Sequence, residues 1–208
     1  MPDTPDLWTA PAALVLASGS ATRLAALRAL GLRAECVPPQ VDERAREAEY
    51  LASGGDLAGL AACLARAKAL EVGRRRPAAI CLGADQTLTS RNATFHRSAT
   101  LAEAAANLAK LAGQTHALVS AACVVRDGEV LFELQDQAHL TMRRLSAGQI
   151  QAYLDAAGPA ALASVGGYQI EALGLHLFER VAGDHATILG LPLLALLSRF
   201  RALGYVAL

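Results

Sequence analysis

A strand–loop–helix pattern at Leu14–Gly31 restricts the fold of this chain more than any other feature. Its first four residues are apolar, the small polar loop Ser18-Gly19-Ser20 follows, and leucines at helical spacing come next. Ser20 or Thr22 can cap that helix, and the final glycine is typical of a helix end. Backbone amides at a helix start bind anions, and the Arg23 guanidinium suits phosphate oxygens. The pattern predicts a phosphate-binding loop, although an ordinary turn with a surface arginine is the better reading of this stretch alone.

The composition of the 208 residues is that of a globular protein without a nucleic-acid surface. Hydrophobic residues make up 53% and charged residues 18%, and 19 basic and 19 acidic side chains give a net charge of +0. A nucleic-acid surface would need a basic excess, whereas a small anionic ligand needs only a few local cations. The four cysteines form no C-x-x-C pair, so we expect neither a disulfide nor a zinc site, and a cytoplasmic location. The apolar stretch Ala186–Leu197 is too short and interrupted to predict a membrane span.

Helical and strand-like patterns alternate along the chain with no linker between them. They predict a single domain over residues 1–208 with an α/β fold, in which helices flank a mixed sheet. A bilobed arrangement with a central cleft is an alternative that the patterns leave undecided. Residues 1–11 are expected to be a flexible N-terminus. The predicted elements are helices at Leu57–Val72, Thr100–Gly113, Ser146–Gly158 and from Leu191, and strands at Ala78–Gly83, His116–Val125, Glu129–Leu134, Gln135–Arg144 and Leu175–Arg180, with a hairpin turn at Asp127-Gly128.

Two acids and a lysine are candidates for chemistry. Glu43, after Asp42 on a predicted loop or strand end, can contribute an oxygen ligand to a hard cation, although such loop acids are usually only solvated. Lys68 follows Leu64 by one helical turn, so its ammonium either points into a pocket or reaches outward to solvent. Asp85 follows a predicted core strand, at the edge where open α/β sheets bind ligands, and a turn-forming aspartate is the alternative.

Two further polar regions have weaker local patterns. Thr89–Ala99, which contains Arg97, is predicted to be a loop whose length suggests that it covers part of the molecule. Ala163–Gly174 is interrupted by glycines and has a single acid, Glu171. Neither the P-loop motif nor the dinucleotide-binding glycine motif occurs in the chain, which weighs against an unrelated phosphoryl transferase.

The order and spacing of these motifs resemble those of the Maf (septum-formation-inhibitor-like) family of nucleoside triphosphate pyrophosphatases, from Leu14 to Gly204. The stretches that carry the resemblance are L-A-S-x-S-x-x-R at 16–23, Val41-Asp42-Glu43, Lys68, Gly83-Ala84-Asp85, Gly166-x-Tyr168 and Gly190-Leu191-Pro192-Leu193. The departures from the family pattern are Ala21 and Thr22 where Pro-Arg is common, Arg97-Ser98 in place of Lys-Pro, and the absence of the usual lysine near Ser164. These departures bear on substrate preference more than on the type of reaction.

The resemblance implies a fold like that of the inosine-triphosphate pyrophosphatases, a homodimer, and a divalent cation, Mg²⁺ or Mn²⁺. It also implies hydrolysis of a nucleoside triphosphate to the monophosphate and pyrophosphate. Asp85 is expected to orient or deprotonate the attacking water and, together with Glu43, to bind the metal ion. The residues expected to bind the triphosphate are Ser18, Ser20, Arg23, Lys68 and Arg97.

Gln86, Glu171 and the stretch Leu177-Phe178-Glu179-Arg180 resemble the branch of the family that hydrolyses 7-methyl-GTP. An ionised carboxylate only accepts hydrogen bonds, which suits the N1–H and N2–H₂ donors of guanine and the positive charge of its methylated ring. We therefore expect Gln86 and Glu171 to bind the nucleotide. Two alternatives stay open: a dTTP/UTP pyrophosphatase of the same family, and a nucleotide-binding regulator of cell division with little turnover.

Overall fold

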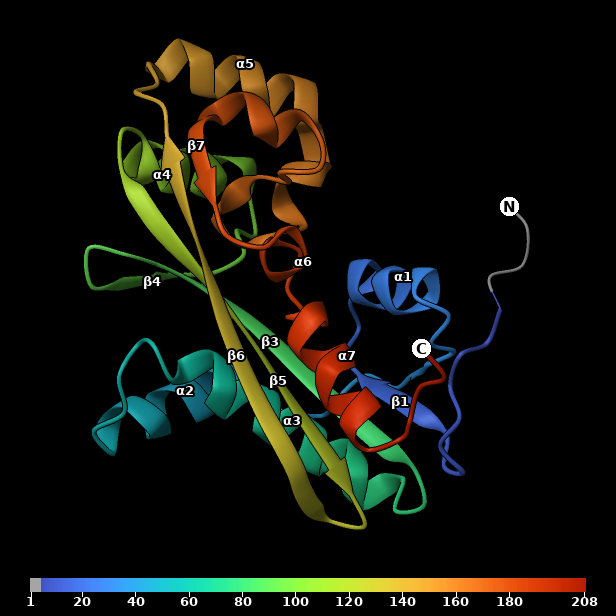
Figure 1. Ribbon diagram of the computed structural model, residues 1–208. Helices are drawn as coiled ribbons and strands as arrows, with labels where there is room; N and C mark the ends of the chain where they lie inside the picture. The colour runs from blue at the N-terminus through green and yellow to red at the C-terminus, as the bar shows by residue number, and fades with distance from the viewer. Residues whose placement is uncertain (1–4) are drawn as a thin grey trace. The chain divides into compact units, whose positions relative to one another are not determined.

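The computed structural model describes residues 5–208, which form two compact units built from separate chain segments (Figure 1). The first unit contains the chain up to Gln86 together with residues 120–136 and 184–208. The second unit contains residues 87–119 and 137–183. Residues 1–4, part of the segment expected to be flexible, lie outside the described residues. Three strands run through both units: β3 (Ile80–Ser90), β5 (Thr115–Arg126) and β6 (Glu129–Met142).

The first unit contains the parallel part of the sheet. β1 (Leu14–Ala17) pairs in parallel with β2 (Glu35–Cys36) on one side and with β3 on the other, and the strand order continues through β5 and β6. All four residues of β1 are buried, which explains why the strand is an uninterrupted apolar run. The helices of this unit are α1 (Ala21–Ala29), α2 (Glu43–Ala52), α3 (Leu60–Arg75), α6 (His185–Ile188) and α7 (Leu193–Ala202).

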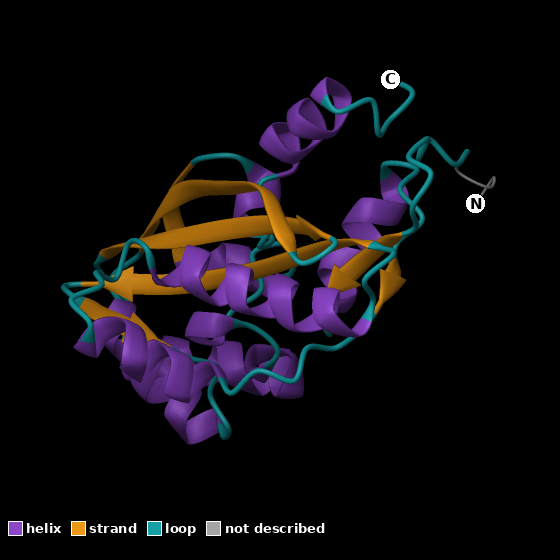
Figure 2. Ribbon diagram, turned by 90° about the horizontal axis from the view of Figure 1, so that it is seen from below, coloured by secondary structure: helices purple, strands orange, loops and turns teal. Residues whose placement is uncertain are grey.

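Alternate residues of β1 pack into two different hydrophobic cores. Leu16 belongs to a core that contains Leu27 of α1 and Phe200 of α7. Val15, the preceding residue, belongs to a core that contains Val72 of α3. Because successive side chains of a strand point to opposite faces, α1 and α7 cover one face of these strands and α3 covers the other. Helices on both sides of the strands are visible in Figure 2. The α/β fold with a mixed sheet confirms the prediction.

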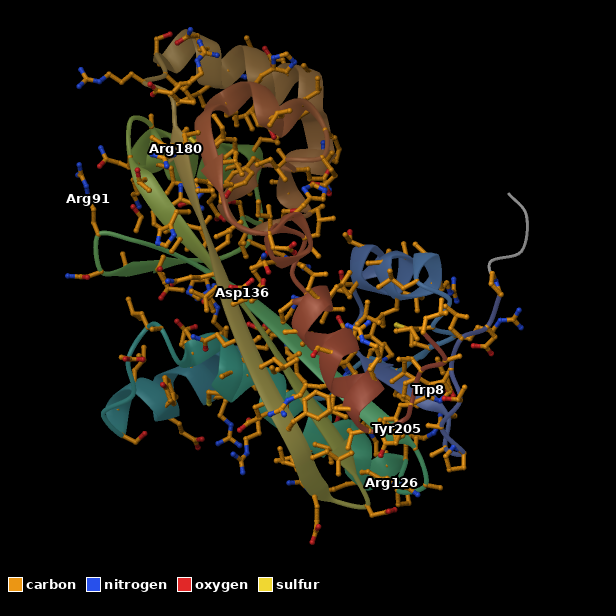
Figure 3. All side chains as sticks on the ribbon, in the orientation of Figure 1. Trp8, Arg91, Arg126, Asp136, Arg180 and Tyr205 are labelled. Atoms are coloured by element: carbon orange, nitrogen blue, oxygen red, sulfur yellow. The ribbon has the colours of Figure 1, made fainter. Side chains whose placement is uncertain are left out.

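Segments near the two chain ends pack together within the first unit. Trp8 forms an antiparallel bridge with Val206, and the Ala207 amide donates to the carbonyl of Leu7 at 3.0 Å. The Trp8 ring lies edge-on to Phe200, with centroids 5.2 Å apart, and 5.6 Å from the ring of Tyr205 (Figure 3). Packing of this partly buried aromatic side chain against the core holds residues 7 and 8 in place, where the sequence predicts a flexible segment.

The second unit contains an antiparallel hairpin where a loop was expected. β3 and β4 (Ala93–Phe95) pair in antiparallel register, and Leu88 lies opposite Phe95. Arg91, labelled in Figure 3, and Asn92 form the turn with positive φ angles of 48° and 61°. The prediction of a covering loop at Thr89–Ala99 is therefore wrong, because both Leu88 and Phe95 are buried and their cross-strand pairing continues β3.

Helices and one further strand complete the second unit. β7 (Phe178–Ala182) pairs antiparallel with β6, and the α-helices are α4 (Leu101–Leu111) and α5 (Ala147–Ala157). Three short 3₁₀ helices cover residues 158–162, 165–167 and 173–177. The buried ring of His116 contributes Nε2 to a hydrogen bond with the Tyr168 hydroxyl at 2.6 Å.

Two predicted boundaries shift for local reasons. The helix predicted from Leu57 begins at Leu60, because the Asp56 carboxylate first accepts a hydrogen bond from the Gly59 amide at 2.8 Å. The two strands predicted over residues 129–144 are one strand, β6. Within residues 5–208, no helix combines the length and the apolar character that a membrane span needs.

Candidate active site

Asp85 lies inside β3, at a point where the parallel neighbour β1 has already ended. The last pair of the β1–β3 register joins Ala17 and Gly83, so Asp85 is two residues beyond the end of β1. It is 6% exposed. The prediction that Asp85 follows the strand is wrong, because pairing with β4 extends β3 to Ser90, and a turn-forming role is excluded with it. Asp85 nevertheless lies at the carboxyl end of the parallel part of the sheet, as expected.

Gly83 allows α3 to approach β3 closely. A Cβ atom at this position would overlap the Ala65 carbonyl oxygen and would lie 2.6 Å from the Ala69 backbone nitrogen. Ala65 and Ala69 of α3 face Gly83, and their small side chains leave room for the strand at this point. Because Gly83 and Asp85 share one face of β3, the close approach brings the side chain of Lys68, also on α3, within reach of Asp85.

Lys68 joins two carboxylates from different parts of the chain. Its Nζ lies 2.5 Å from Oδ1 of Asp85 and 2.7 Å from Oε1 of Glu43. Lys68 is 5% exposed, so its ammonium points inward and the alternative of a solvated lysine is wrong. The Glu43 side chain is 54% exposed.

Glu43 lies on a helix and not on a loop or strand end. Asp42 caps α2 by accepting a hydrogen bond from the Ala45 amide at 3.0 Å, and Glu43 is therefore the first residue of that helix. The loop prediction is wrong, because capping by Asp42 starts a helix directly after the proline-containing segment. A carboxylate in the first turn is also favoured by the helix dipole.

Burial is the largest influence on the Asp85 carboxyl group, and it raises the pKa of that group above its ordinary value. The Lys68 ammonium and the Arg23 guanidinium oppose this rise, whereas the Glu43 carboxylate adds to it. A carboxylate with a raised pKa accepts a proton more readily than an ordinary aspartate, which suits a general base.

The loop between β1 and α1 contains Ser18 and Ser20, and the first turn of α1 carries Arg23, whose guanidinium lies near Asp85. Ser20 caps α1 by accepting a hydrogen bond from the Arg23 amide at 3.3 Å, and Ser18 Oγ accepts one from the Ser20 amide at 3.1 Å. The Arg23 guanidinium donates from Nη1 to the Ala84 carbonyl at 3.0 Å and to Ser18 Oγ at 3.3 Å. It also donates from Nε to a third oxygen, the carbonyl of Gly190, at 2.8 Å. Arg23 is therefore a partly buried side chain held by three oxygens and not a free surface arginine, and phosphate binding by this loop stays a prediction.

Gln86 is held by other atoms of the first unit. Its amide nitrogen donates to Ser120 Oγ and to the carbonyl oxygens of Thr187 and Ile188. Sequence reasoning gave no role to Ser120 or Thr187, and it noted Gly190 only as part of a motif. Gly190 and Arg23 are 167 residues apart, so no local pattern could indicate their contact.

Arg97 and Glu171 belong to the second unit, whereas the other predicted site residues belong to the first. Both side chains are exposed. Arg97 follows β4 and precedes the buried Ser98, which accepts a hydrogen bond from Asn107. Glu171 lies in a turn between Ile170 and the last 3₁₀ helix. Their roles in phosphate and base binding stay predictions.

Glu43 and Asp85 are the carboxylates that could bind a metal ion. Both contact the same lysine nitrogen, so their oxygens converge on one point. In the described part of the chain, no group of three or more His, Cys, Asp or Glu side chains is arranged to hold a metal ion. Mg²⁺ is commonly bound by one or two carboxylates together with substrate phosphates and water. The donor pair fits that mode of binding, and it does not form a complete cage of protein ligands.

Comparison with known proteins gives a consistent result over nearly the whole chain. The model of the Maf-like protein family matches residues 13–203. The chain is 50% identical over 193 residues to a 7-methyl-GTP pyrophosphatase of Mesorhizobium japonicum, across 93% of this chain and 97% of the relative. It is 47% identical over 197 residues to a nucleoside triphosphate pyrophosphatase of Nitrobacter winogradskyi, across 94% and 96% of the two chains. A protein of the same description from Rhodopseudomonas palustris is 46% identical over 196 residues, across 94% and 96%.

Proposed function

The chain belongs to the Maf-like protein family and is a nucleoside triphosphate pyrophosphatase, and on that premise we propose that it prefers 7-methyl-GTP and needs a divalent cation. The observation that carries the proposed chemistry is the buried carboxylate of Asp85, which lies beside two cations and next to the start of α1. Such a site combines a proton acceptor with groups that stabilise phosphate charge.

Asp85 acts as the general base. It takes a proton from a water molecule, whose oxygen attacks the α-phosphorus while the bond from that phosphorus to the bridging oxygen breaks and pyrophosphate leaves. Lys68 keeps the Asp85 carboxylate oriented and ionised until the proton moves. A divalent cation bound by Glu43 and Asp85 would neutralise phosphate charge and lower the pKa of a water ligand.

The triphosphate binds where α1 begins. The hydroxyl groups of Ser18 and Ser20 and the start of the helix supply hydrogen bonds to phosphate oxygens. Arg23 is held by backbone carbonyl oxygens, so little side-chain entropy is lost when an anion binds. Arg97 is proposed as a further triphosphate-binding residue on the resemblance alone.

Glu171 reads the base. Its ionised carboxylate accepts hydrogen bonds from the N1–H and N2–H₂ groups of guanine, and it favours the positive charge of the 7-methylated ring. The relative from Mesorhizobium japonicum, 50% identical, carries the description 7-methyl-GTP pyrophosphatase, which supports 7-methyl-GTP as the proposed substrate. The homodimer is proposed on the resemblance alone, and the cytoplasmic location is proposed because the four cysteines form no C-x-x-C pair.

The test is pyrophosphate release from 7-methyl-GTP, GTP, dTTP and UTP, each with Mg²⁺, Mn²⁺ or EDTA. We expect metal-dependent release with the highest kcat/KM for 7-methyl-GTP. Higher kcat/KM for dTTP or UTP would overturn the substrate, and undiminished release in EDTA would overturn the cation. Tight nucleotide binding with no release would instead favour a regulator with little turnover.

Glu171→Gln tests the base-reading role directly. We expect its kcat/KM for 7-methyl-GTP to fall about tenfold or more relative to UTP, because a glutamine offers one donor where two donors of guanine need acceptors. Glu129→Gln is the matched control, since Glu129 is an exposed acid next to the β5–β6 turn. If Glu171→Gln leaves the order of nucleotides unchanged, Glu171 does not read the base.

A further inference from the structure

A tight turn in the second unit carries Glu171. The amide of Ala172 donates to the carbonyl oxygen of Gln169 at 3.2 Å, so residues 169–172 form a β-turn. Ile170, at the second position of this turn, is buried, whereas Glu171 at the third position is exposed. The place of the Glu171 carboxylate therefore depends on how firmly the backbone on each side of the turn is held.

Tyr153, on α5, contacts the backbone directly before this turn. Its hydroxyl group donates to the carbonyl oxygen of Gly167 at 3.2 Å and accepts a hydrogen bond from the backbone amide of Gln169. One oxygen atom thereby holds the peptide groups on both sides of Tyr168. A tyrosine hydroxyl can donate and accept at the same time, so this atom satisfies one donor and one acceptor of the main chain.

The side chain between these two contacts is an anchor of its own. Tyr168 is 4% exposed, and its ring lies edge-on to Phe178 with centroids 4.8 Å apart. Its hydroxyl group is hydrogen-bonded to Nε2 of the buried His116 at 2.6 Å. A buried ring fixes the position of its own Cα, whereas the peptide groups on either side can still rotate. The two hydrogen bonds of Tyr153 restrict that rotation and so fix the direction in which the chain enters the turn.

The segment after the turn is held by close packing of the backbone. A Cβ atom at Gly174 would lie 2.8 Å from both the carbonyl carbon and the nitrogen of Gln169, so the two residues pack backbone to backbone. Gly174 is buried and belongs to the last 3₁₀ helix, which begins at Leu173 directly after the turn. Gln169 therefore contacts both Gly174 and Tyr153, and the turn that it starts has little freedom to move.

We propose that Tyr153 is a positioning residue that sets the turn at residues 169–172, and with it the Glu171 carboxylate, and thereby contributes to the choice of nucleotide. The proposal rests on the proposed function, since it takes Glu171 as the residue that accepts hydrogen bonds from guanine. Tyr153 acts through Glu171 and not by contact with the nucleotide, because its hydroxyl group is bound to the main chain of the protein.

Displacement of the base reader and a general loosening of the protein predict different kinetics. A displaced Glu171 changes the ratio of kcat/KM between nucleotides, because guanine presents two adjacent N–H donors and uracil presents one between two carbonyl groups. General loosening lowers kcat/KM by one common factor, because all nucleoside triphosphates carry the same phosphates. The ratio of kcat/KM for 7-methyl-GTP to that for UTP therefore isolates the effect on Glu171.

The kinetic experiment measures pyrophosphate release from 7-methyl-GTP and UTP by Tyr153→Phe, which removes the hydroxyl group and keeps the ring. We expect the ratio of kcat/KM for 7-methyl-GTP to that for UTP to fall about 3- to 10-fold. Tyr205→Phe is the matched control, because Tyr205 is a partly buried tyrosine that packs against Trp8 in the first unit. The control should leave the ratio unchanged, and an unchanged ratio in Tyr153→Phe would overturn the proposal. Melting temperatures of the same samples identify any variant that is partly unfolded.

A double-mutant cycle tests whether the effect of Tyr153 passes through Glu171. If it does, adding Tyr153→Phe to Glu171→Gln changes the ratio by less than about twofold, because the carboxylate that Tyr153 positions is already gone. A second fall in the ratio, by the same factor as in Tyr153→Phe alone, would overturn the proposal, since Tyr153 would then influence the choice of nucleotide independently of Glu171.

A readout that needs no turnover keeps this test independent of the proposed function. The Ala172 amide, which closes the turn, is recorded by ¹H–¹⁵N NMR in protein labelled with ¹⁵N-alanine and assigned by its absence in Ala172→Gly. We expect its exchange with water to be about tenfold faster in Tyr153→Phe than in the parent and in Tyr205→Phe. Unchanged exchange would overturn the positioning role. Faster exchange in a protein whose order of nucleotides does not depend on Glu171 would support the placement of the turn by Tyr153 and reject base reading by Glu171 instead.

Discussion

Gly83→Ala tests whether the close approach of α3 to β3 builds the site. The added Cβ would lie 2.6 Å from the Ala69 nitrogen and closer still to the Ala65 carbonyl oxygen, whereas ordinary contact begins at 3.4 Å, so the helix or strand must move by more than about 0.8 Å. Overpacking of this size costs about 1–3 kcal/mol of unfolding free energy, partly offset by the lower entropy of an unfolded chain with alanine. The same movement separates Lys68 from Asp85, and a shift near 1 Å lowers kcat/KM by up to about 100-fold.

Urea unfolding and pyrophosphate release measure the two effects of this substitution separately. We expect a lower urea midpoint with an unchanged slope, and a loss of kcat/KM at temperatures where Gly83→Ala is fully folded. Gly148→Ala is the matched control: Gly148 lies in the first turn of α5, is exposed, and has no atom nearer than 3.9 Å to an added Cβ. That control should be neutral or slightly stabilising. If Gly83→Ala unfolds and turns over like the parent protein, the argument from close approach is refuted.

The further predictions concern three side chains. Asp85→Asn removes the proton acceptor, so pyrophosphate release should fall about 100- to 10,000-fold with unfolding free energy unchanged or higher; near-normal turnover would reject the role. Because burial raises the pKa of Asp85, parent activity should fall on the acid side at a pH above the ordinary aspartate value of 3.8. Burial lowers the pKa of His116 from 6.5 to about 4, so the folded state binds fewer protons than the unfolded state between these values and stability falls as the pH falls. From pH 6.5 to 4.5 the parent should lose about 2 kcal/mol more unfolding free energy than His116→Gln, and equal losses would contradict the assignment. Trp8→Ala should lower the unfolding free energy by about 2–4 kcal/mol, measured by circular dichroism in urea. In the parent protein Trp8 is the chain's one tryptophan, so its fluorescence reports on this segment. A fluorescence transition at lower urea than the circular dichroism transition would show that the segment detaches first.

Local sequence signals predicted the elements whose ends are set by local contacts. Ser20 caps α1, and Gly31 follows its end with a φ of +71°. Ser146 forms a capping box with Gln149 at the start of α5. In each case the interacting groups lie within a few residues of one another, so the pattern is readable in a short stretch. α2 escaped prediction because none of its residues is buried, and it therefore lacks a periodic apolar face.

The contacts that complete the site could not be predicted in the same way. Lys68 gave two readings, inward or outward, and only the approach of α3 at Gly83 decides between them. The Gly190 carbonyl that holds Arg23 has no side chain, so residue type alone cannot indicate its role. The resemblance predicts Gln86 at the nucleotide, but no local pattern indicates that its amide nitrogen is bound to oxygens more than 30 residues away in the chain.

The first unit is assembled from three separated stretches of chain, and this has a consequence for the order of events during synthesis. Arg23, Lys68 and Asp85 leave the ribosome early, whereas the Gly190 carbonyl and α7 come from the stretch 184–208. Closing a loop of 167 residues costs about 2.5 kcal/mol more entropy than closing one of ten, so the Arg23–Gly190 contact forms late. Nascent chains that have not reached this stretch should therefore be unable to cleave nucleotides, and phosphate cleavage begins only after the segment around Gly190 has been made and docked.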